Sequence, residues 1–579
     1  MTVREYLPCA KGGKNMTRAS EKICDVLIEA GIDHVFGIPG GGTIPIWNAL
    51  FDRQDKIKAV LTRHEQAAGC MADMYGRMTG KPGVLMGQGA FIASSGGFGI
   101  LEGYLFGSPM LILTDTSDDG LSQHGNYQSG TGEHGSFDIA GILRSMSKYT
   151  TYAVTPEEAV QGVQFAIKHA TTGRPGPSCV VMRNRAITGE IDPEGIPRIY
   201  PTSGYLKESL SIPTMEDIEK ASRLLLEAQR PVVIAGSGVH SSRAYSELRE
   251  LAEFLGAPVA TSYKGKSAFP EVNPLALGMM GTFGQKVANN VIADADLLLV
   301  AGCRLSPSDT RRENQNLIDP SRQRIVQIDI DPRNAGWIFP VEMGLVGDLK
   351  TVLGQILDTL KGLTGGKVAN AGDRVEALGK RKKNENYCEA EELHSDESPL
   401  LPQRIVREIE EAVDASTIIT LDAGNNRLWM AHFFRSKEVR TVFCPGGIAG
   451  MGWSPPAALA AKLLNPDKPV LSVSGDGGFT MMTHVLSTAV QYDLPVVFLV
   501  MNNSVLGMVR DGQRERPIAS EFIETDFAQI ARAYGCQGIS VSKPEELGPA
   551  IKEAFQASLP TLINVATSRS EPFFKIASF

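Results

Sequence analysis

The sequence predicts an α/β protein made of three doubly wound parallel-sheet domains, on three observations. Short apolar runs alternate with amphipathic stretches along almost the whole chain, which is typical of parallel strands joined by crossover helices. At 579 residues the chain is too long for one hydrophobic core, so about two to four domains are expected. A Pro-rich stretch and a highly charged stretch interrupt the alternation and divide it into three blocks.

Each block contains strand-like runs followed by loops. The first has DHVFGIPGG, GVLMGQG, PMLILTDT and SCVVMRN, the second has PVVIAGSGV, DLLLVAGCR and RIVQIDIDP, and the third has PVLSVSGD and PVVFLVMNN. Helical spacing appears between them, as in EKICDVLIEAG and EQAAGCMADMYGRMTG. The polar GKRKKNENYCEAEELHSDESP has no apolar period and suits a solvated connector. The predicted organisation is an N-terminal extension (1–15), a first domain (16–191), a central domain (192–375), a linker (376–399) and a third domain (400–579).

Composition excludes several classes of protein. A net charge of −8 argues against a nucleic-acid binder, which needs a basic face. The 8 cysteines form no Cys-x-x-Cys pair, so reduced thiols fit better than disulfides or a zinc site. Residues 1–15 lack the apolar core of a signal peptide, and no apolar run is long enough for a membrane span. We expect a cytoplasmic protein without nucleic-acid or membrane partners.

The stretch GDGGFTMMTHVLSTAVQYDLPVVFLVMNN places an acid and an amide after two successive strand-like runs. Asp476 and Asn503 therefore fall on neighbouring loops, with TMMTHVLSTAVQYD predicted as one helix between them. A carboxylate, an amide and a backbone carbonyl suit Mg²⁺ or Ca²⁺. Glycines 475, 477 and 478 leave backbone N–H groups free for a phosphate. The pattern indicates a metal-held diphosphate; the alternative, favoured for Gly-Asp-Gly alone, is an N-cap followed by a turn.

The spacing of 24 residues between GDG and NN resembles the thiamine diphosphate fingerprint of the thiamine-dependent decarboxylase and carboligase superfamily. The resemblance implies that Asp476, Asn503 and the Val505 carbonyl ligate Mg²⁺. It also implies that the first domain binds the pyrimidine and the third binds the diphosphate. The residues implied to bind the cofactor are Gly40, Glu65, Asn425, Asn426, Gly450, Met451, Gly475, Asp476, Gly477, Gly478, Asn503, Leu506, Gly507 and Met508.

Two of these residues carry specific roles by the resemblance. TRHEQAAGCMADMYGRMTG is similar to the segment bearing the acid that protonates the aminopyrimidine, which makes Glu65 the candidate catalytic residue. The alternative is that Glu65 is a solvated residue of a helix. GGIAGMGWSPPAALAAK places Met451 where an apolar side chain bends the cofactor, although a methionine is more often core filler.

Beyond the superfamily, the chain resembles the acetolactate (acetohydroxyacid) synthase branch over nearly its full length. The similar segments are VFGIPGGGTIPIWNAL, AFPEVNPLALGMMG, PGGIAGMGWSPPAALAAKLLNPDKPV and AVQYDLPVVFLVMNNSVLGMVRDGQ. The resemblance implies decarboxylation of a 2-oxo acid, most simply pyruvate, and ligation of the two-carbon unit to a second carbonyl, as in branched-chain amino acid biosynthesis. It also implies a homodimer or homotetramer, with the acid and the diphosphate site on different subunits.

The match breaks in the substrate pocket. Phe91-Ile92 replaces a Thr-Asn pair, Gly135 stands at a glutamine position, Gly512 at a tryptophan, and Ser306-Pro307 at a pair of acids. Candidate polar groups for the altered pocket are His124, Gln128 and His134, unless they are solvated loop residues. The departures keep open a different thiamine-dependent lyase, decarboxylase or acyl-transferase, and a non-catalytic paralogue.

The central domain resembles the part of these relatives that binds FAD in a structural role. The matching positions are Gly236, Gly238, Arg304, Asp329 and Asp348. Other members of the superfamily keep the fold with ADP or without a nucleotide. GSGVHSS also resembles a dinucleotide loop, but alone it supports a dinucleotide-binding oxidoreductase poorly.

Overall fold

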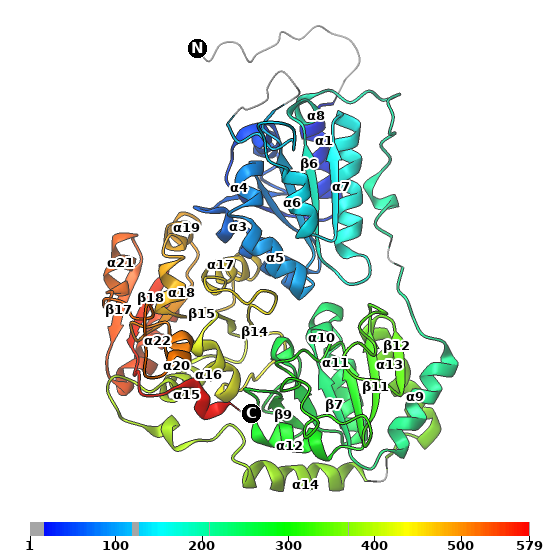
Figure 1. Ribbon diagram of the computed structural model, residues 1–579, viewed down its shortest axis with the longest axis vertical. Helices are drawn as coiled ribbons and strands as arrows, with labels where there is room; N and C mark the ends of the chain where they lie inside the picture. The colour runs from blue at the N-terminus through cyan, green and yellow to red at the C-terminus, as the bar shows by residue number, and fades with distance from the viewer. Residues whose placement is uncertain (1–16, 119–126, 208, 369, 578–579) are drawn as a thin grey trace.

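The computed structural model describes residues 17–118, 127–207, 209–368 and 370–577, which form three α/β domains. In Figure 1 the first domain is blue to cyan at the top, the central domain is green at the lower right, and the third is yellow to red on the left. Each domain contains one six-stranded sheet, and the paired strands are parallel. The predicted fold class is confirmed.

The first sheet has the order β2-β1-β3-β4-β6-β5. Its inner strands are buried along their whole length because helices cover both faces, which explains their nearly continuous apolar sequences. The strands are β1 (His34–Gly37), β2 (Lys58–Leu61), β3 (Gly83–Gly87), β4 (Met110–Asp115), β5 (Tyr149–Ala153) and β6 (Pro177–Met182). The helices are α1 (Ala19–Glu29), α2 (Ile44–Phe51), α3 (Glu65–Thr79), α4 (Gly89–Ala93), α5 (Gly97–Phe106), α6 (Ile139–Ser145), α7 (Pro156–Thr171) and α8 (Asn184–Thr188).

The central sheet has a different order, β12-β11-β10-β7-β8-β9, with the chain reversing direction across the sheet between β10 and β7. The strands are β7 (Pro231–Ala235), β8 (Val259–Thr261), β9 (Ala276–Met279), β10 (Leu297–Ala301), β11 (Arg324–Asp329) and β12 (Met343–Val346). The helices are α9 (Met215–Glu227), α10 (Ser237–Ser242), α11 (Tyr245–Leu255), α12 (Lys286–Asp294), α13 (Leu349–Thr364) and α14 (Ala371–Asn384). This is the strand order of dinucleotide-binding domains.

The third sheet, β14-β13-β15-β16-β18-β17, repeats the connectivity of the first. Its strands are β13 (Ile418–Leu421), β14 (Val442–Phe443), β15 (Val470–Gly475), β16 (Val497–Asn502), β17 (Gln537–Val541) and β18 (Thr561–Ala566). The helices are α15 (Pro402–Ala412), α16 (Asn425–Phe433), α17 (Ser454–Leu464), α18 (Asp476–Thr480), α19 (Val485–Gln491), α20 (Gly507–Gln513), α21 (Phe527–Ala533) and α22 (Pro544–Gln556). A short 3-10 helix, η7 (Phe573–Ile576), follows the last strand.

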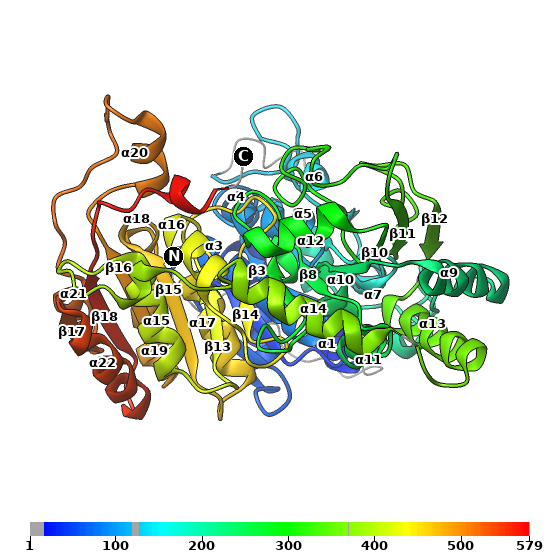
Figure 2. The same cartoon turned by 90° about the horizontal axis from the view of Figure 1, so that it is seen from below.

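The first and third domains share a hydrophobic core. Helix α3 packs against α5 of its own domain and against α17 of the third domain. The two views place α3 and α17 between the sheets of these domains (Figures 1 and 2). Because α3 is buried nearly all round, its glycines and alanines allow close helix contacts. The shared core fixes how the two domains sit against each other.

Two segments differ from the sequence prediction. The stretch expected to be one helix between Asp476 and Asn503 forms α18 and α19, separated by a tight turn at residues 481–484. The turn arises because Met482 and Val485 donate their N–H groups three residues back, which buries Met482 against the shared core. The expected solvated connector begins as α14, whose Leu378 packs on the central domain.

Residues 1–15, predicted to be an extension, lie outside the described residues. Among the helices that the structure describes, none combines the length and the apolar character that crossing a bilayer requires.

Candidate functional site

The predicted cofactor residues of the third domain follow four neighbouring parallel strands. Asn425 comes after β13, Met451 after β14, Asp476 after β15 and Asn503 after β16. These strands lie side by side in the order β14-β13-β15-β16, so their carboxyl ends share one edge of the sheet. Ligands of open parallel sheets bind at this edge. The structure therefore gathers the predicted residues in one place.

Asp476 is buried at the first position of α18 with one oxygen unused. Its Oδ1 accepts a hydrogen bond from the Gly477 N–H at 2.7 Å. Its Oδ2 is buried and has no hydrogen-bond partner within the described residues. Burial raises the pKa of Asp476, and the nearby amides of Gly477, Ser504 and Val505 offset part of this rise. A buried carboxylate oxygen without a partner is costly unless a cation completes its environment.

Asn503 is held in a turn beside this carboxylate. The Val505 N–H donates to Asn503 Oδ1 at 3.3 Å. Ser504 adopts φ 56, a left-handed conformation that non-glycine residues adopt rarely and that is often found at functional sites. Arg569 Nε donates to the Asn503 carbonyl at 2.6 Å, so the segment after β18 supports the turn.

Asn425 and Asn426 lie against the same loops. Asn425 Nδ2 donates to Asp511 Oδ2 at 3.0 Å, and its Oδ1 is buried without a partner among the described residues. Asn426 Nδ2 donates to the Asp422 carbonyl at 2.9 Å. A Cβ added to Gly507 would lie 2.7 Å from Asn425 Nδ2. The start of α20 and the start of α16 are therefore in contact.

Close packing leaves little room for a side chain at Gly477 and Gly478. A Cβ on Gly477 would lie 2.8 Å from Leu506 Cδ2, and one on Gly478 would lie 2.1 Å from Asp422 Oδ2. A Cβ on Gly475 would lie 3.5 Å from Asn426 Oδ1. Larger residues at 477 or 478 would displace these neighbours.

The residues present fit a metal-held diphosphate. The carboxylate, amide and carbonyl oxygens expected at Asp476, Asn503 and Val505 form the hard-oxygen set that Mg²⁺ takes. Two of the site's polar atoms, Asp476 Oδ2 and Asn425 Oδ1, are buried without partners among the described residues. The described part of the chain contains no cluster of three His, Cys, Asp or Glu side chains able to bind a metal, so a metal here depends on this mixed set.

Met451 lies in the loop between β14 and α17 and is half-buried. The loop runs along α5 of the first domain: a Cβ on Gly450 would lie 2.3 Å from Phe98 Cε2. Leu506 precedes α20, and Met508 in its first turn is 37% exposed. Leu506 therefore packs next to Gly477 of the Asp476 loop, and Met508 is partly exposed.

Glu65 is the first residue of α3, following β2 at the carboxyl edge of the first sheet. The ring of the preceding His64 accepts the Gln66 N–H at 3.2 Å and caps the helix. Glu65 is half-buried, and within the described residues its carboxylate forms no ion pair. Gly40 follows β1 at the same edge, next to Gln88: an added Cβ would lie 3.4 Å from Gln88 Oε1.

The surroundings of Glu65 contact the third domain of the same chain. The His64 and His484 ring centroids are 5.8 Å apart, and a Cβ on Gly452 would lie 3.7 Å from Gln66 Nε2. Among the described residues, however, no hydrogen bond joins Glu65 to the loop of Asp476 or of Asn503. Within the described residues of one chain, the predicted acid is therefore not hydrogen-bonded to the predicted diphosphate loops.

The altered pocket is only partly described. His124 lies outside the described residues. Gln128 is exposed, adopts φ 65 and accepts a hydrogen bond from Gln88 Nε2. His134 is exposed as well. Gln128 thus reaches the first-domain edge near Gly40, whereas His134 makes no such contact.

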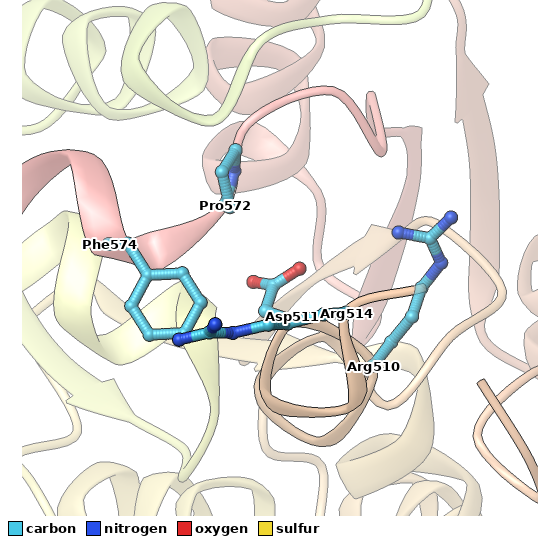
Figure 3. Close-up of a pocket in the computed structure, with 5 residues that line it drawn as sticks. All are labelled: Arg510, Asp511, Arg514, Pro572 and Phe574. Atoms are coloured by element: carbon cyan, nitrogen blue, oxygen red, sulfur yellow. The ribbon is translucent and has the colours of Figure 1, made fainter. Parts of the chain in front are cut away.

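Gly512 faces open space: a Cβ there would meet nothing within 4 Å. Beside it, a cavity of about 360 Å³ opens between α20 and the C-terminal segment (Figure 3). Arg510, Asp511 and Arg514 line one side, and Pro572 and Phe574 line the other. Figure 2 shows α20 at the outer edge of the third domain. Two arginine side chains therefore border a hollow next to the candidate site.

The residues predicted to bind FAD gather at the carboxyl edge of the central sheet. Gly236 follows β7, Arg304 follows β10, Asp329 ends β11 and Asp348 follows β12, four strands that are adjacent in the sheet. Gly236 and Gly238 pack against Gly302, where an added Cβ would lie 2.2 and 2.6 Å away. Asp348 is occupied as the N-cap of α13, accepting the Thr351 N–H at 2.9 Å.

Three cations that form no ion pair with a described residue border this edge, with Asp309, Asp329 and Asp331 nearby. Arg174 and Arg304 both donate to the Leu105 carbonyl, at 2.9 and 3.4 Å. Burial, with the nearby Arg304 guanidinium, lowers the pKa of Lys264 to about 8. None of the three forms an ion pair with a described residue. A bound anion would relieve this concentration of positive charge, which fits the diphosphate of a dinucleotide.

Sequence reasoning missed two buried acids next to the site. Asp422, at the end of β13, accepts backbone N–H groups from residues 452–454. Glu102, in α5, accepts backbone N–H groups from the preceding part of the same loop. An acid directly after a strand, and a lone acid in the apolar GILEGYLF, were the available signals, because charges are buried only when paired.

Comparisons with known proteins agree with this geometry. Three family models match: "Thiamine pyrophosphate enzyme, N-terminal TPP binding domain" at residues 17–136, the "central domain" at 218–356, and the "C-terminal TPP binding domain" at 422–565. The chain is 34% identical to a "Probable acetolactate synthase large subunit" of Methanocaldococcus jannaschii, covering 96% of this chain and 92% of the relative. It is 32% identical to the "Acetolactate synthase large subunit" of Corynebacterium glutamicum (94% and 84% covered). It is 30% identical to "Acetolactate synthase isozyme 3 large subunit" of Escherichia coli (93% and 92%).

Proposed function

This chain belongs to the thiamine pyrophosphate enzymes, and from that premise we propose that it is an acetolactate synthase-like enzyme. It decarboxylates pyruvate and ligates the two-carbon unit to a second carbonyl compound, the chemistry of branched-chain amino acid biosynthesis. The observation that carries the proposal is the buried, partnerless Asp476 Oδ2 within the Gly-Asp-Gly loop, between the turn at Asn503 and the asparagine pair after β13.

The third domain supplies the anchor for the cofactor. Asp476, Asn503 and the Val505 carbonyl would hold Mg²⁺, whose charge would help to bind the diphosphate. Asn425, Gly477 and the start of α20 would surround the phosphates, since these groups already touch one another. Thiamine diphosphate, when bound, supplies the carbon nucleophile and the electron sink of the reaction.

The first domain supplies the acid. Glu65 would hold a proton at the pyrimidine ring, a role that needs a carboxyl group shielded from water. In one chain Glu65 is half-buried and its carboxylate forms no ion pair among the described residues. We therefore propose that the acid of one subunit completes the site of another, as a homodimer or homotetramer would allow. Exposed apolar side chains on both domains support this: Phe91 (40%), Met481 (51%), Val509 (46%) and Phe522 (44%).

The substrate pocket supports an acceptor other than that of typical synthases as the second candidate. The open space at Gly512 leaves room for a larger acceptor. The neighbouring Arg510 and Arg514 could attract the carboxylate of a 2-oxo acid as it enters (Figure 3). A screen of 2-oxo acids and aldehydes with pyruvate as donor would identify the acceptor from the product profile.

FAD in a structural role is proposed for the central domain. The support is the dinucleotide strand order and three cations at the carboxyl edge that form no ion pair among the described residues, Arg174, Lys264 and Arg304. Purified protein would then be yellow, and Arg304→Ala would lower its flavin content. A colourless protein that releases no flavin on denaturation would contradict this assignment.

A cytoplasmic location is also proposed. The seven cysteines that the structure describes are free thiols, as expected in a reducing compartment.

The decisive experiment measures acetolactate formation from pyruvate with and without Mg²⁺ and thiamine diphosphate. We expect turnover only when both are present. Release of CO₂ without a ligated product would indicate a simple decarboxylase. Absence of any thiamine-dependent consumption of pyruvate or another 2-oxo acid, despite cofactor uptake, would favour a non-catalytic paralogue.

A further inference from the structure

The loop that carries Met451 (residues 446–454) donates backbone hydrogen bonds to buried carboxylates on both sides of Met451. On one side, Glu102 Oε1 accepts the N–H groups of Gly446 and Gly447, each at 2.7 Å, and Oε2 accepts that of Ala449 at 3.0 Å. On the other side, Asp422 accepts three N–H groups at residues 452–454, with distances from 2.9 to 3.3 Å. Between the two sets lie only residues 450 and 451.

The two carboxylates come from different domains. Glu102 belongs to α5 of the first domain, and Asp422 follows β13 of the third. The loop approaches α5 very closely, because a Cβ on Gly447 would lie 2.2 Å from the Glu102 carbonyl oxygen. The position of Met451 therefore depends on the contact between the first and third domains.

The charge balance around Glu102 favours strong hydrogen bonds from the loop amides to this carboxylate. Glu102 shares the guanidinium of Arg77 with Asp73, at 2.8 and 2.7 Å, and both carboxylate side chains are fully buried. One guanidinium cannot neutralise two carboxylates, so the loop amides supply the remaining positive potential. Burial alone would raise the pKa of Glu102, but Arg77 and the amides of Gly447, Gly446 and Ala449 outweigh it, and the pKa lies below its usual value.

The buried cluster of Arg77, Asp73 and Glu102 also contacts the loop residue Trp453, which follows Met451. Trp453 Nε1 donates to Asp73 Oδ2 at 2.8 Å, and the Arg77 guanidinium lies over the rings of Phe106 and Trp453, 3.5 and 4.6 Å from their centroids. Arg77 Nη1 donates to the Cys444 carbonyl at 2.8 Å. The buried cluster thus contacts the loop before and after Met451.

The residues on either side of positions 450 and 451 have left-handed backbone conformations. Ala449 adopts φ 55 and Gly452 adopts φ 89, both in the left-handed region. For Ala449 such a conformation costs of the order of 1 kcal/mol and persists only where the surroundings impose it. Here the surroundings are the two carboxylates, each bonded to one of these residues.

We infer that Glu102 and Asp422 are positioning residues for the thiamine-dependent reaction, which act by fixing the loop that presents Met451 to the cofactor from both domains. The inference rests on the proposed function, since it assigns Met451 to the cofactor. Glu102 and Asp422 are separate from the residues proposed to bind the metal, to bind the diphosphate or to supply the acid. Neither of these two carboxylates needs to touch the substrate.

The test compares Glu102→Gln and Asp422→Asn with a matched control, Glu271→Gln. Glu271 is also a buried acid, paired with Lys266 at 2.8 Å, and it accepts the Ser436 N–H at 2.9 Å across another domain contact. It does not bond to the Met451 loop. An amide at 102 or 422 keeps the shape but cannot accept all the loop N–H groups, because its NH₂ opposes them.

Backbone hydrogen exchange of the cofactor-free protein gives a readout independent of activity. We expect faster exchange at residues 446–449 in Glu102→Gln and at 452–454 in Asp422→Asn, with both segments unchanged in Glu271→Gln. Unchanged exchange in the first two variants would overturn the inference, as would an equally large acceleration at these segments in the Glu271→Gln control.

Steady-state kinetics then separate positioning from folding. In Glu102→Gln we expect kcat to fall by about 10²-fold, since displacements near 1 Å have this effect, while thiamine diphosphate affinity changes little. In a Met451→Ala background, the same substitution should cost much less, because the residue it positions is gone. Independent, multiplicative losses, or a loss matched by Glu271→Gln, would contradict the inference. No turnover in the wild type would instead count against the proposed function.

Discussion

The first and third domains have the same strand connectivity but different chemistry at their carboxyl edges. In the first domain, Asp115 ends β4, and its carboxylate accepts the N–H groups of Gly42, Gly89 and Ser117 at 2.7, 3.0 and 3.1 Å. In the third domain, Asp476 follows β15, and its Oδ2 has no partner within the described residues. Burial raises the pKa of both acids.

The difference shows how one architecture provides two half-sites. In the first domain the chain satisfies its own buried acid, and the loops are closed by internal hydrogen bonds. In the third domain an acid oxygen and an amide oxygen remain for a ligand. A partnerless buried oxygen therefore distinguishes Asp476 from Asp115, while in the loop after Asp115 one oxygen of Asp118 also lacks a partner among the described residues.

The largest effect is expected from Asp476→Asn. Loss of the charge should weaken Mg²⁺ binding by several kcal/mol and reduce turnover by about 10³-fold or more. Calorimetry should detect little uptake of thiamine diphosphate with Mg²⁺ present. Asp467→Asn, an exposed acid of the same domain, is the control and should behave like the wild type. Normal Mg²⁺-dependent uptake in Asp476→Asn would contradict the assignment.

Glu65→Gln should separate catalysis from binding. An amide cannot hold the proton for the pyrimidine, so we expect kcat to fall by at least about 10²-fold while the cofactor still binds. The measurement is turnover at saturating thiamine diphosphate, with uptake measured in parallel. Full activity in this variant would remove Glu65 from the mechanism.

Asn425→Ala should have a smaller effect on binding. Its buried Oδ1 can accept a hydrogen bond from a group bound to the phosphate or from a metal-bound water. Losing one such hydrogen bond costs about 1.5 kcal/mol, or roughly tenfold in affinity. Titration of the stripped protein with thiamine diphosphate at fixed Mg²⁺ measures this change. An unchanged dissociation constant would show that Asn425 only supports Asp511.

Asp115→Ala should have the smallest effect on turnover and a clear one on stability. Three N–H groups would lose their acceptor, which should lower the free energy of unfolding by about 3 kcal/mol. Urea denaturation of the cofactor-free protein measures this quantity. A loss of Mg²⁺-dependent uptake as large as in Asp476→Asn would show that the two edges do not differ as described.

Much of the fold followed from local sequence. Buried parallel strands such as β3, β10 and β16 are short apolar runs, and β15 and β16 end within one residue of the predicted Asp476 and Asn503. The sequence also predicts the helix start at Glu65, because an apolar periodic segment follows this residue directly. The confirmed family relationship rests on the same local motifs.

The parts that could not be predicted depend on distant contacts. Glu102 meets the Met451 loop across about 345 positions of sequence, and no periodic pattern records such a contact. The split between α18 and α19 depends on Met482 entering the core shared with the first domain. Arg569 lies 66 positions from the carbonyl it supports, in a segment without any motif.

The contact of Arg569 with the Asn503 carbonyl has a consequence for the end of the chain. The third sheet is complete at Ala566, yet the eleven described residues beyond it contact the candidate site again. The Phe573 N–H donates to Asp511, which also accepts a hydrogen bond from Asn425. A protein shortened to residue 568 should therefore keep all its strands but lose the support that Arg569 gives to the Asn503 turn, and calorimetry should show weaker Mg²⁺-dependent uptake of thiamine diphosphate. If Asn503 binds Mg²⁺ as proposed, the last residues of the chain would hold in place a turn that binds the ion.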